Sequence, residues 1–204
     1  RPETARHWQA GPAYSVFDCK ADLFALLTAL GQTPDRFQIA AAEQSHWHPG
    51  QSAALKLGPK VTIAHFGALH PGVLDKIGVD GPLFGFELDL DALPKSKAKA
   101  SKTKAVLERS DLQPVRRDFA FIVDNKAQAQ RFIAAAKSAD KQLISGVSVF
   151  DLYKGERISS DMMSIAIEVT LQPKDKTLTD ADIEAVSKRI IAAVEKATGA
   201  TLRR

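Results

Sequence analysis

Tyr153 and Asp151, two residues apart, are the side chains in this sequence best suited to recognise a nucleobase. Residues two apart in a strand point to the same face of a sheet. A tyrosine ring on an exposed sheet can stack on a base, and a carboxylate can accept hydrogen bonds from the donors on its Watson–Crick edge. Guanine, with N1 and N2 donors, would suit Asp151. The alternative is that Tyr153 only covers the sheet edge beside the turn at Lys154 and Gly155, and spacing alone leaves both interpretations open.

The sequence gives less support to a metal site or a catalytic nucleophile. Zinc favours imidazole ligands, and an H-x-H spacing can place two of them together. The HPG and HP contexts favour turns, however, so we predict structural or surface roles for His46, His48, His65 and His70. Cys19 is the only cysteine, which excludes an internal disulfide, and it is predicted to be a small buried residue. The sequence contains neither a GxSxG nucleophile elbow nor a phosphate-binding glycine loop, so no catalytic residue and no metal site are assigned.

A base-binding pair needs a sheet with one open face, and the order of elements after residue 109 predicts one. The patterns predict strands and helices in the order βαββαβ, at 116–123, 128–139, 143–153, 162–171, 180–198 and 200–203. This is the order of a ferredoxin-like sandwich, in which both helices cover one face of a four-stranded antiparallel sheet. Thr179, with Asp182 three residues on, is predicted to cap the second helix, and Gly199 to end it.

Alternation along the strands predicts which side chains lie on the open face. In 162–171 the set expected under the helices is Ile165, Ile167, Val169 and Leu171. The set expected on the solvent face is Ser164, Ala166, Glu168 and Thr170. In the strand before it, Phe150 and Leu152 are expected on the core side, which places Asp151 and Tyr153 together on the open face.

The first part of the chain is predicted to be an α+β module with antiparallel character. Its helices are expected at 22–30 and 71–77 and its strands at 37–41, 53–57, 60–66 and 83–88. The stretch from Pro94 to Lys104 then contains five lysines, no acid and no large apolar residue, so it cannot bury enough surface to offset the entropy of ordering. We therefore predict modules at 1–93 and 109–204, joined by a lysine-rich linker at 94–108. That linker is either a solvated loop or a basic strap lying on phosphates.

Composition and charge limit the class of protein. The chain has 204 residues, 45% hydrophobic and 25% charged, as expected for one or two globular domains. Residues 1–93 hold 7 Lys and Arg against 10 Asp and Glu, whereas residues 109–204 hold 16 against 13, which favours a polyanionic partner for the second half. No apolar run could span a bilayer, and the N-terminus has neither a signal peptide nor an initiator methionine. We predict a cytoplasmic chain without a membrane partner, cut from something longer.

Five segments of the second module carry a family signature: LQPVRRDFAFIVD (112–124), VFDLYKGERI (149–158), MSIAIEVTLQP (163–173), KTLTDADIEAV (176–186) and ATGATLR (197–203). Through them, residues 109–204 resemble the ferredoxin-fold anticodon-binding domain of the bacterial phenylalanyl-tRNA synthetase β subunit. The first module is similar to the end of the catalytic-like domain of that subunit, through VFDCKADLFALL (16–27), HPGQSAAL (48–55), HFGALHP (65–71) and FGFELDLDALP (84–94). The resemblance thus implies a partial class II synthetase-like module followed by a ferredoxin-like one.

The resemblance also implies an activity and partners. The parent enzyme would be an (αβ)₂ heterotetramer that joins phenylalanine to tRNA-Phe using ATP and magnesium, with the chemistry in the α subunit. It implies no catalysis and no cofactor in this chain. Class II enzymes place an arginine after a glutamate to hold ATP, whereas here Glu87 is followed by Leu88.

Carried over by position, the resemblance assigns stacking on the first anticodon base to Tyr153. It places Asp151 and Ser164 near that base. Arg116 and Arg117 of the RRD motif are family-like further contacts, although Arg117 has the alternatives of pairing with Asp118 or capping the sheet. The competing hypothesis is a ferredoxin-like protein-interaction or regulatory domain that binds no RNA, since fold alone does not determine function.

Overall fold

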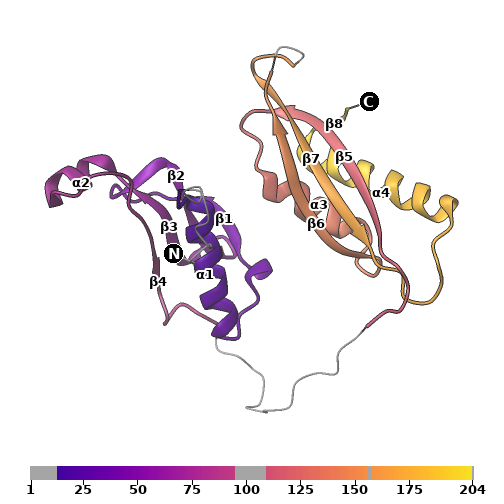
Figure 1. Cartoon of the computed structure of the whole chain (residues 1–204), viewed down its shortest axis with the longest axis horizontal. Coiled ribbons are helices and arrows are strands. Elements are labelled where there is room, and N and C mark those ends of the chain that lie inside the picture. Colours follow the sequence, from indigo (N-terminus) through magenta and orange to yellow (C-terminus); the bar gives the residue numbers. More distant parts are fainter. Residues whose placement is uncertain (1–12, 95–108, 156–157, 204) are drawn as a thin grey trace, which may run out of the picture. The chain divides into compact units, whose positions relative to one another are not determined.

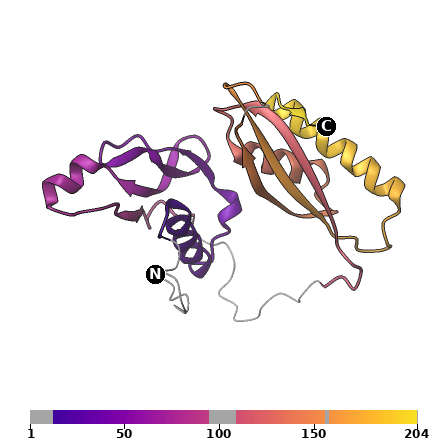
Figure 2. The same ribbon diagram turned by 45° about the horizontal axis from the view of Figure 1, so that its top comes forward.

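The structure is a computed structural model that describes residues 13–94, 109–155 and 158–203. The chain divides into two compact units, residues 1–103 and 104–204. Each unit has its own sheet and helices (Figures 1 and 2). The predicted linker at 94–108 lies outside the described residues, apart from Pro94. No helix in the described ranges is long and apolar enough to cross a membrane.

The first unit is a four-stranded antiparallel sheet with helix α1 packed on one face. Its elements in chain order are α1 (Val16–Ala29), the 3-10 turn η1 (Pro34–Arg36), β1 (Gln38–Ala41), β2 (Trp47–Leu57), β3 (Val61–Leu69), α2 (Pro71–Ile77) and β4 (Phe84–Leu88). The strands lie in the order β1-β2-β3-β4, so each pairs with its neighbour in the sequence. Leu23 and Leu27 of α1 are buried in one cluster with Leu55 and Ile63 of the sheet.

Two elements of this unit begin earlier than predicted. Helix α1 starts at Val16 because Ser15 and Asp18 form a capping box, in which each side chain accepts a hydrogen bond from the other residue's N–H. Strand β2 starts at Trp47, and its pairing with β3 is irregular as far as Ser52, across the HPG segment that argued against a strand. Cys19 is 1% exposed, which confirms the prediction of a buried residue, and this burial raises the pKa of its thiol.

The second unit is the predicted ferredoxin-like sandwich. Its elements are β5 (Val115–Asp124), α3 (Ala129–Ala139), β6 (Ile144–Tyr153), β7 (Met162–Leu171), α4 (Asp180–Thr198) and β8 (Thr201–Leu202). The strands are antiparallel and lie in the order β6-β7-β5-β8, which makes β6 and β8 the two edges. Both helices lie on the same side of this sheet (Figures 1 and 2).

One core joins the sheet to the two helices. The predicted apolar side of β7 is confirmed, because Ile165, Ile167, Val169 and Leu171 are all fully buried. Val186, Ile190 and Val194 of α4 pack into the same cluster. The predicted ends of α4 are also confirmed: Thr179 and Asp182 form a capping box, and Gly199 ends the helix at a φ of 70°, which glycine adopts readily.

Candidate nucleic-acid interface

One row of residues on the outer face of the second sheet, the side away from α3 and α4, runs through Ser164. Ser164 in β7 pairs with Tyr153 in β6 and with Ile122 in β5, and Ile122 pairs with Thr201 in β8. Residues directly opposite one another in a sheet share a face. The alternation that buries Ile165 on the helix side therefore puts this whole row on the outer face.

A second row lies two residues along β7. Ala166 pairs with Asp151 in β6 and with Ala120 in β5. Arg203 extends this row past β8, because its backbone N–H donates to the Ala120 carbonyl at 2.8 Å. The two rows bring Tyr153, Asp151 and Ser164 together as predicted, and they add Arg203.

Tyr153 and Arg203 approach one another on the outer face. The Arg203 Cζ atom lies 5.6 Å from the centre of the Tyr153 ring, within cation–π distance. The two residues belong to opposite edges of the sheet. Ser164 is only 3% exposed and Ala166 only 8%. The prediction that these two side chains lie open to solvent is therefore wrong in exposure, although they lie on the predicted side of the sheet.

The position of the Tyr153 ring also depends on Gly155 in the turn after β6. A Cβ atom built on Gly155 would collide with the hydroxyl end of the Tyr153 side chain. The ring therefore occupies space that only a glycine leaves free. Gly155 and Arg203 together fix where the aromatic surface lies.

Phe150 and Leu152 do not enter the core as predicted. They are 57% and 51% exposed. The register of β6 against β7 shifts between Val149 and Asp151, so Phe150 is an extra residue in the edge strand. Beyond this shift Leu152 does pair with Ile165, but at an edge of the sheet that the core cluster does not cover. Asp151 keeps its predicted place on the outer face and is exposed.

The two arginines of the RRD motif point to opposite sides of the sheet. Arg116 pairs with Thr170 and lies on the outer face, where its Nη1 atom is 3.7 Å from Glu168 Oε2. Arg117 pairs with Val169, so it lies on the helix side, where its Nη1 donates to the Arg116 carbonyl at 3.4 Å. The structure thus separates Arg117 from Tyr153, because neighbouring residues in a strand face opposite ways. Arg116 shares the correct face, but six positions along β7 from Ser164, about 20 Å at the usual rise per residue.

The outer face carries more acids than bases. Asp118, Asp124, Asp151 and Glu168 alternate with buried core positions and belong to this face, together with Arg116 and Arg203. Asp118 and Glu168 lie directly opposite one another in β5 and β7. Such a face repels phosphates and suits the donor edges of bases.

Arg203 is a candidate site residue that the sequence did not reveal. The pattern predicted a final strand at 200–203, but a short strand does not reveal its partner. The pairing of this strand with β5 puts Arg203 on the outer face, near the Tyr153 ring.

The four histidines have local roles in the structure. His70 Nδ1 accepts from the Gly72 N–H at the start of α2, and His48 Nδ1 accepts from the Gly50 N–H, both at 3.1 Å. His46 Nε2 lies 3.4 Å from Glu87 Oε1, and burial lowers the pKa of His65. No three His, Cys, Asp or Glu side chains gather as a metal site in the described ranges.

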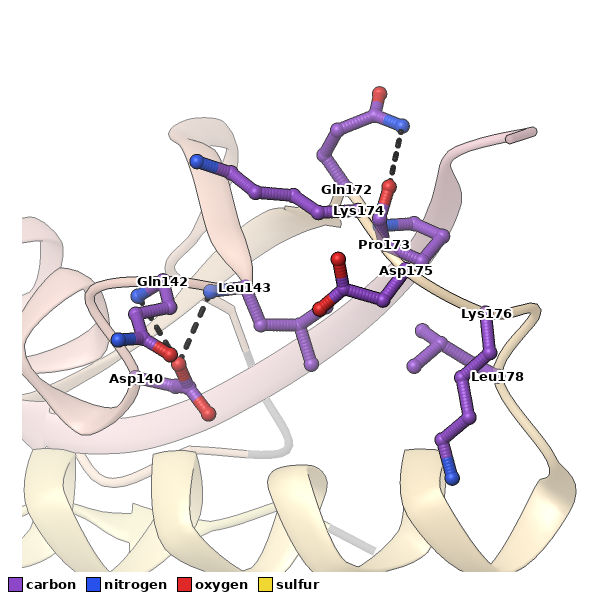
Figure 3. A pocket seen from close by; sticks show the side chains of 9 residues that line it. All are labelled: Asp140, Gln142, Leu143, Gln172, Pro173, Lys174, Asp175, Lys176 and Leu178. Carbon is purple, nitrogen blue, oxygen red and sulfur yellow. Dashed lines mark hydrogen bonds between the residues drawn. The ribbon is translucent and has the colours of Figure 1, made fainter. Parts of the chain in front are cut away.

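A hollow of about 200 Å³ lies at the other end of the second unit, between the segments around Leu143 and Lys174 (Figure 3). Its lysines alternate with Asp140 and Asp175, so it has no preferred sign of charge. The Asp140 carboxylate accepts the N–H groups of Gln142 and Leu143 and pairs with Arg189 at 2.9 Å. The Asp140 side chain at the edge of the hollow thus makes its contacts within the fold.

Comparison with known proteins agrees with this geometry. The family described as "Ferredoxin-fold anticodon binding domain" matches residues 110–203, and "Phenylalanyl tRNA synthetase beta chain CLM domain" matches residues 2–90. The chain is 54% identical over 200 residues to the phenylalanine-tRNA ligase beta subunit of Paramagnetospirillum magneticum, and 48% identical over 203 residues to that of Nitrobacter winogradskyi. Each alignment covers 97% of this chain and 25% of the relative, so the chain spans about a quarter of the length of these relatives.

The resemblance found in the motifs is confirmed by these matches. Both domains occur in the expected order along the chain. The chain therefore belongs to the phenylalanine-tRNA ligase beta-subunit family, with a CLM domain followed by a ferredoxin-fold anticodon-binding domain.

Proposed function

We propose that the second unit binds the anticodon of tRNA-Phe and that Tyr153 stacks on the first anticodon base. One observation carries this proposal: the Arg203 Cζ atom lies 5.6 Å from the centre of the Tyr153 ring, on the face of the sheet that also carries Asp151. An aromatic ring facing a guanidinium is suited to hold a flat base by stacking on both sides. In the free chain the Arg203 guanidinium lies where a base stacked on the Tyr153 ring would lie, so the bound base and the guanidinium would share this space.

Asp151 supplies selectivity in this proposal. A carboxylate can accept hydrogen bonds from guanine N1 and N2, which adenine and the pyrimidines do not present in that arrangement. Ser164, the β7 partner of Tyr153, is the third member of the proposed site. Arg116 offers a contact further along the same face, and Arg117 has no part in the site because it lies on the other side.

The acidic outer face shapes how RNA would approach. Four carboxylates and two arginines favour the donor edges of splayed bases and turn the phosphates outward. Basic residues outside the face, such as Lys154 in the turn after Tyr153, are better placed for the backbone.

We further propose that the chain acts as part of a cytoplasmic phenylalanine-tRNA ligase, whose α subunit partner charges tRNA-Phe using ATP and magnesium in an (αβ)₂ assembly. The chain itself contributes binding and support. The names of the relatives and the match of both domains support this role. The competing hypothesis of a regulatory protein-interaction domain is not favoured by either match.

The test is a titration of a fluorescent tRNA-Phe anticodon stem-loop with the chain. Tyr153→Ala should weaken binding by about 1–3 kcal/mol, because stacking is lost. Changing the first anticodon base from guanine to adenine should weaken it in the same sense. Phe17→Ala, which removes a 78% exposed aromatic ring from the first unit, is the matched control and should have no effect.

Equal binding of both stem-loops by the wild-type chain and by Tyr153→Ala would refute base recognition at this face. Salt separates the competing hypothesis, since RNA binding releases counterions and weakens steeply as salt rises. A protein contact with an apolar core would respond far less. We expect weak binding by this chain alone, and a low-nanomolar complex would contradict that.

A further inference from the structure

The turn that joins α4 to β8 is bracketed at both ends by one residue, Glu195. The Glu195 backbone carbonyl accepts the N–H of Gly199 at 2.9 Å, where the helix ends. The Glu195 carboxylate accepts the N–H of Leu202 at 3.2 Å, in the strand that follows. One side chain thus ties the strand to the last turn of the helix.

Strand β8 is two residues long and pairs with β5 at two positions, Thr201 with Ile122 and Leu202 with Phe121. The Leu202 side chain also packs against the core cluster of this unit. Successive N–H groups of a strand point to opposite sides. The Arg203 N–H therefore donates to Ala120 of β5, while the Leu202 N–H points away from the sheet, where Glu195 receives it. A hydrogen bond from a backbone N–H to a carboxylate is stronger than one to a neutral acceptor.

Arg203 follows Leu202 directly, and its guanidinium reaches the Tyr153 ring from the opposite edge of the sheet. Its reach across two intervening strands depends on where β8 lies. We infer that Glu195 is a positioning residue for the base site: it holds β8 so that Arg203 faces Tyr153. This inference rests on the proposed function, and it makes recognition of a base depend on a side chain that never touches RNA.

The sign of the expected effect makes the inference testable. Glu195 is an acid in a chain proposed to bind a polyanion, so removing its charge should tighten RNA binding if electrostatics alone mattered. A positioning role predicts the opposite. Glu195→Ala should weaken stem-loop binding, roughly threefold to tenfold, despite the gain in positive charge.

Three variants at Glu195, to Ala, Gln and Asp, separate the effect of side-chain length from the effect of charge. Glu195→Gln keeps an acceptor at the same reach and should bind within about twofold of wild type, the usual limit of additivity between unrelated changes. Glu195→Asp keeps the charge but is one methylene short, and should weaken binding as Glu195→Ala does. Glu184→Ala removes an acid from the same helix, where it pairs with Lys188 at 2.8 Å, and is the charge-matched control.

A double-mutant cycle with Arg203→Ala gives the decisive readout. Glu195→Ala should weaken binding in the Arg203 background and have no further effect once Arg203 is gone. NMR of the free chain adds a measurement that simple destabilisation would not change: the Arg203 side-chain resonances, shifted by the Tyr153 ring current, should move toward unshifted values in Glu195→Ala and Glu195→Asp and stay in place in Glu195→Gln.

Equal effects of Glu195→Ala with and without Arg203, or tighter binding by Glu195→Ala and Glu195→Gln alike, would overturn the inference. If Glu195→Ala does not fold, Glu195→Asp and Glu195→Gln carry the same comparison. If the proposed function itself is wrong, Tyr153→Ala and a changed first anticodon base would also leave stem-loop binding unaltered. A site that depends on Tyr153 but not on Glu195 refutes only the positioning role.

Discussion

Gly155 sets the position of Tyr153 by leaving room for it. The hydroxyl end of the ring occupies the space that any Cβ atom at residue 155 would need. A side chain there must push the ring away, and with it the stacking surface that faces Arg203. A glycine in the turn therefore belongs to the site as much as the aromatic residue does.

Gly155→Ala should weaken binding of the tRNA-Phe stem-loop, by at most the roughly 1–3 kcal/mol that complete loss of the stack would cost. The same fluorescence titration measures it. Gly146→Ala is the matched control in β6, because a Cβ there makes only ordinary contact with Thr170. Unchanged binding by Gly155→Ala would show that the observed ring position is not the one that binds RNA.

At the residue scale, sequence alone could predict Tyr153 and Asp151 but not Arg203. Alternation around Ile165 put Ser164 on the outer side of the sheet. Asp151 and Tyr153 were put there by assigning Phe150 and Leu152 to the core; their face is correct, although those two residues are exposed. Neither alternation nor motif shows that Arg203 lies near Tyr153, because that depends on which edge the last strand joins.

Among the elements, helix α4 begins with a capping box that supports the part of the fold carrying Glu195. The Thr179 hydroxyl oxygen accepts the Asp182 N–H at 3.2 Å, and the Asp182 carboxylate accepts the Thr179 N–H at 3.1 Å. Thr179→Ala should lower the free energy of unfolding by about 1 kcal/mol. Hydrogen exchange of the α4 amides measures the loss. Ser15→Ala, which removes the equivalent cap of α1, should leave the exchange of the α4 amides unchanged. A loss of α4 protection in Ser15→Ala would contradict the expectation that the two units are stabilised independently.

Two carboxylates at element ends make stability depend on pH. Burial alone would raise the pKa of Asp140, but the N–H groups of Leu143 and Gln142 and the Arg189 guanidinium more than offset it, so the pKa is lowered. The Thr179 N–H and hydroxyl lower the pKa of Asp182. A carboxyl whose pKa is lowered by folding stabilises the fold above its unfolded value, about 3.9 for aspartate, and this stabilisation is lost as pH falls toward the folded value.

The unfolding temperature of the second unit should therefore drop as pH falls below about 4. In Asp140→Asn this drop should be shallower, because one of the two linked groups is gone. Calorimetry across that range measures both curves. Asp118→Asn, which removes an acid from the outer face, is the control. A steeper decline in Asp140→Asn than in wild type would contradict the linkage.

Elements could be predicted more fully in the second unit than in the first. Thr179 and Gly199 mark both ends of α4, and clean alternation marks β7. In the first unit the prediction missed the capping box at Ser15, which marks the start of α1. The turn-forming HPG segment argued against a strand where β2 begins. The bulge at Phe150 was beyond prediction, because an inserted residue in an edge strand leaves the sequence pattern unchanged.

For the whole molecule, the proposed base site lies within the second unit, while five lysines of 94–108 lie outside the described residues. If these lysines contact phosphates, replacing Lys95, Lys97, Lys99, Lys102 and Lys104 with glutamine should lower the salt dependence of stem-loop binding. The slope of log affinity against log salt should fall by about 0.7 for each phosphate that is no longer neutralised. Replacing five surface lysines elsewhere controls for net charge. An unchanged slope would make the segment a spacer only.

The strand order β6-β7-β5-β8 also sets the order in which this site can be assembled. Tyr153 and Ser164 lie on strands that are consecutive in the sequence, separated only by residues 154–161, so their pairing closes a short loop and costs little entropy. Ile122 and Thr201 are far apart along the chain, and their pairing must wait for the intervening elements. We therefore expect Arg203 to reach the Tyr153 ring late in folding. Changes at Arg203 or Glu195 should accelerate unfolding and leave the folding rate nearly unchanged, whereas changes in the β6–β7 hairpin should slow folding itself.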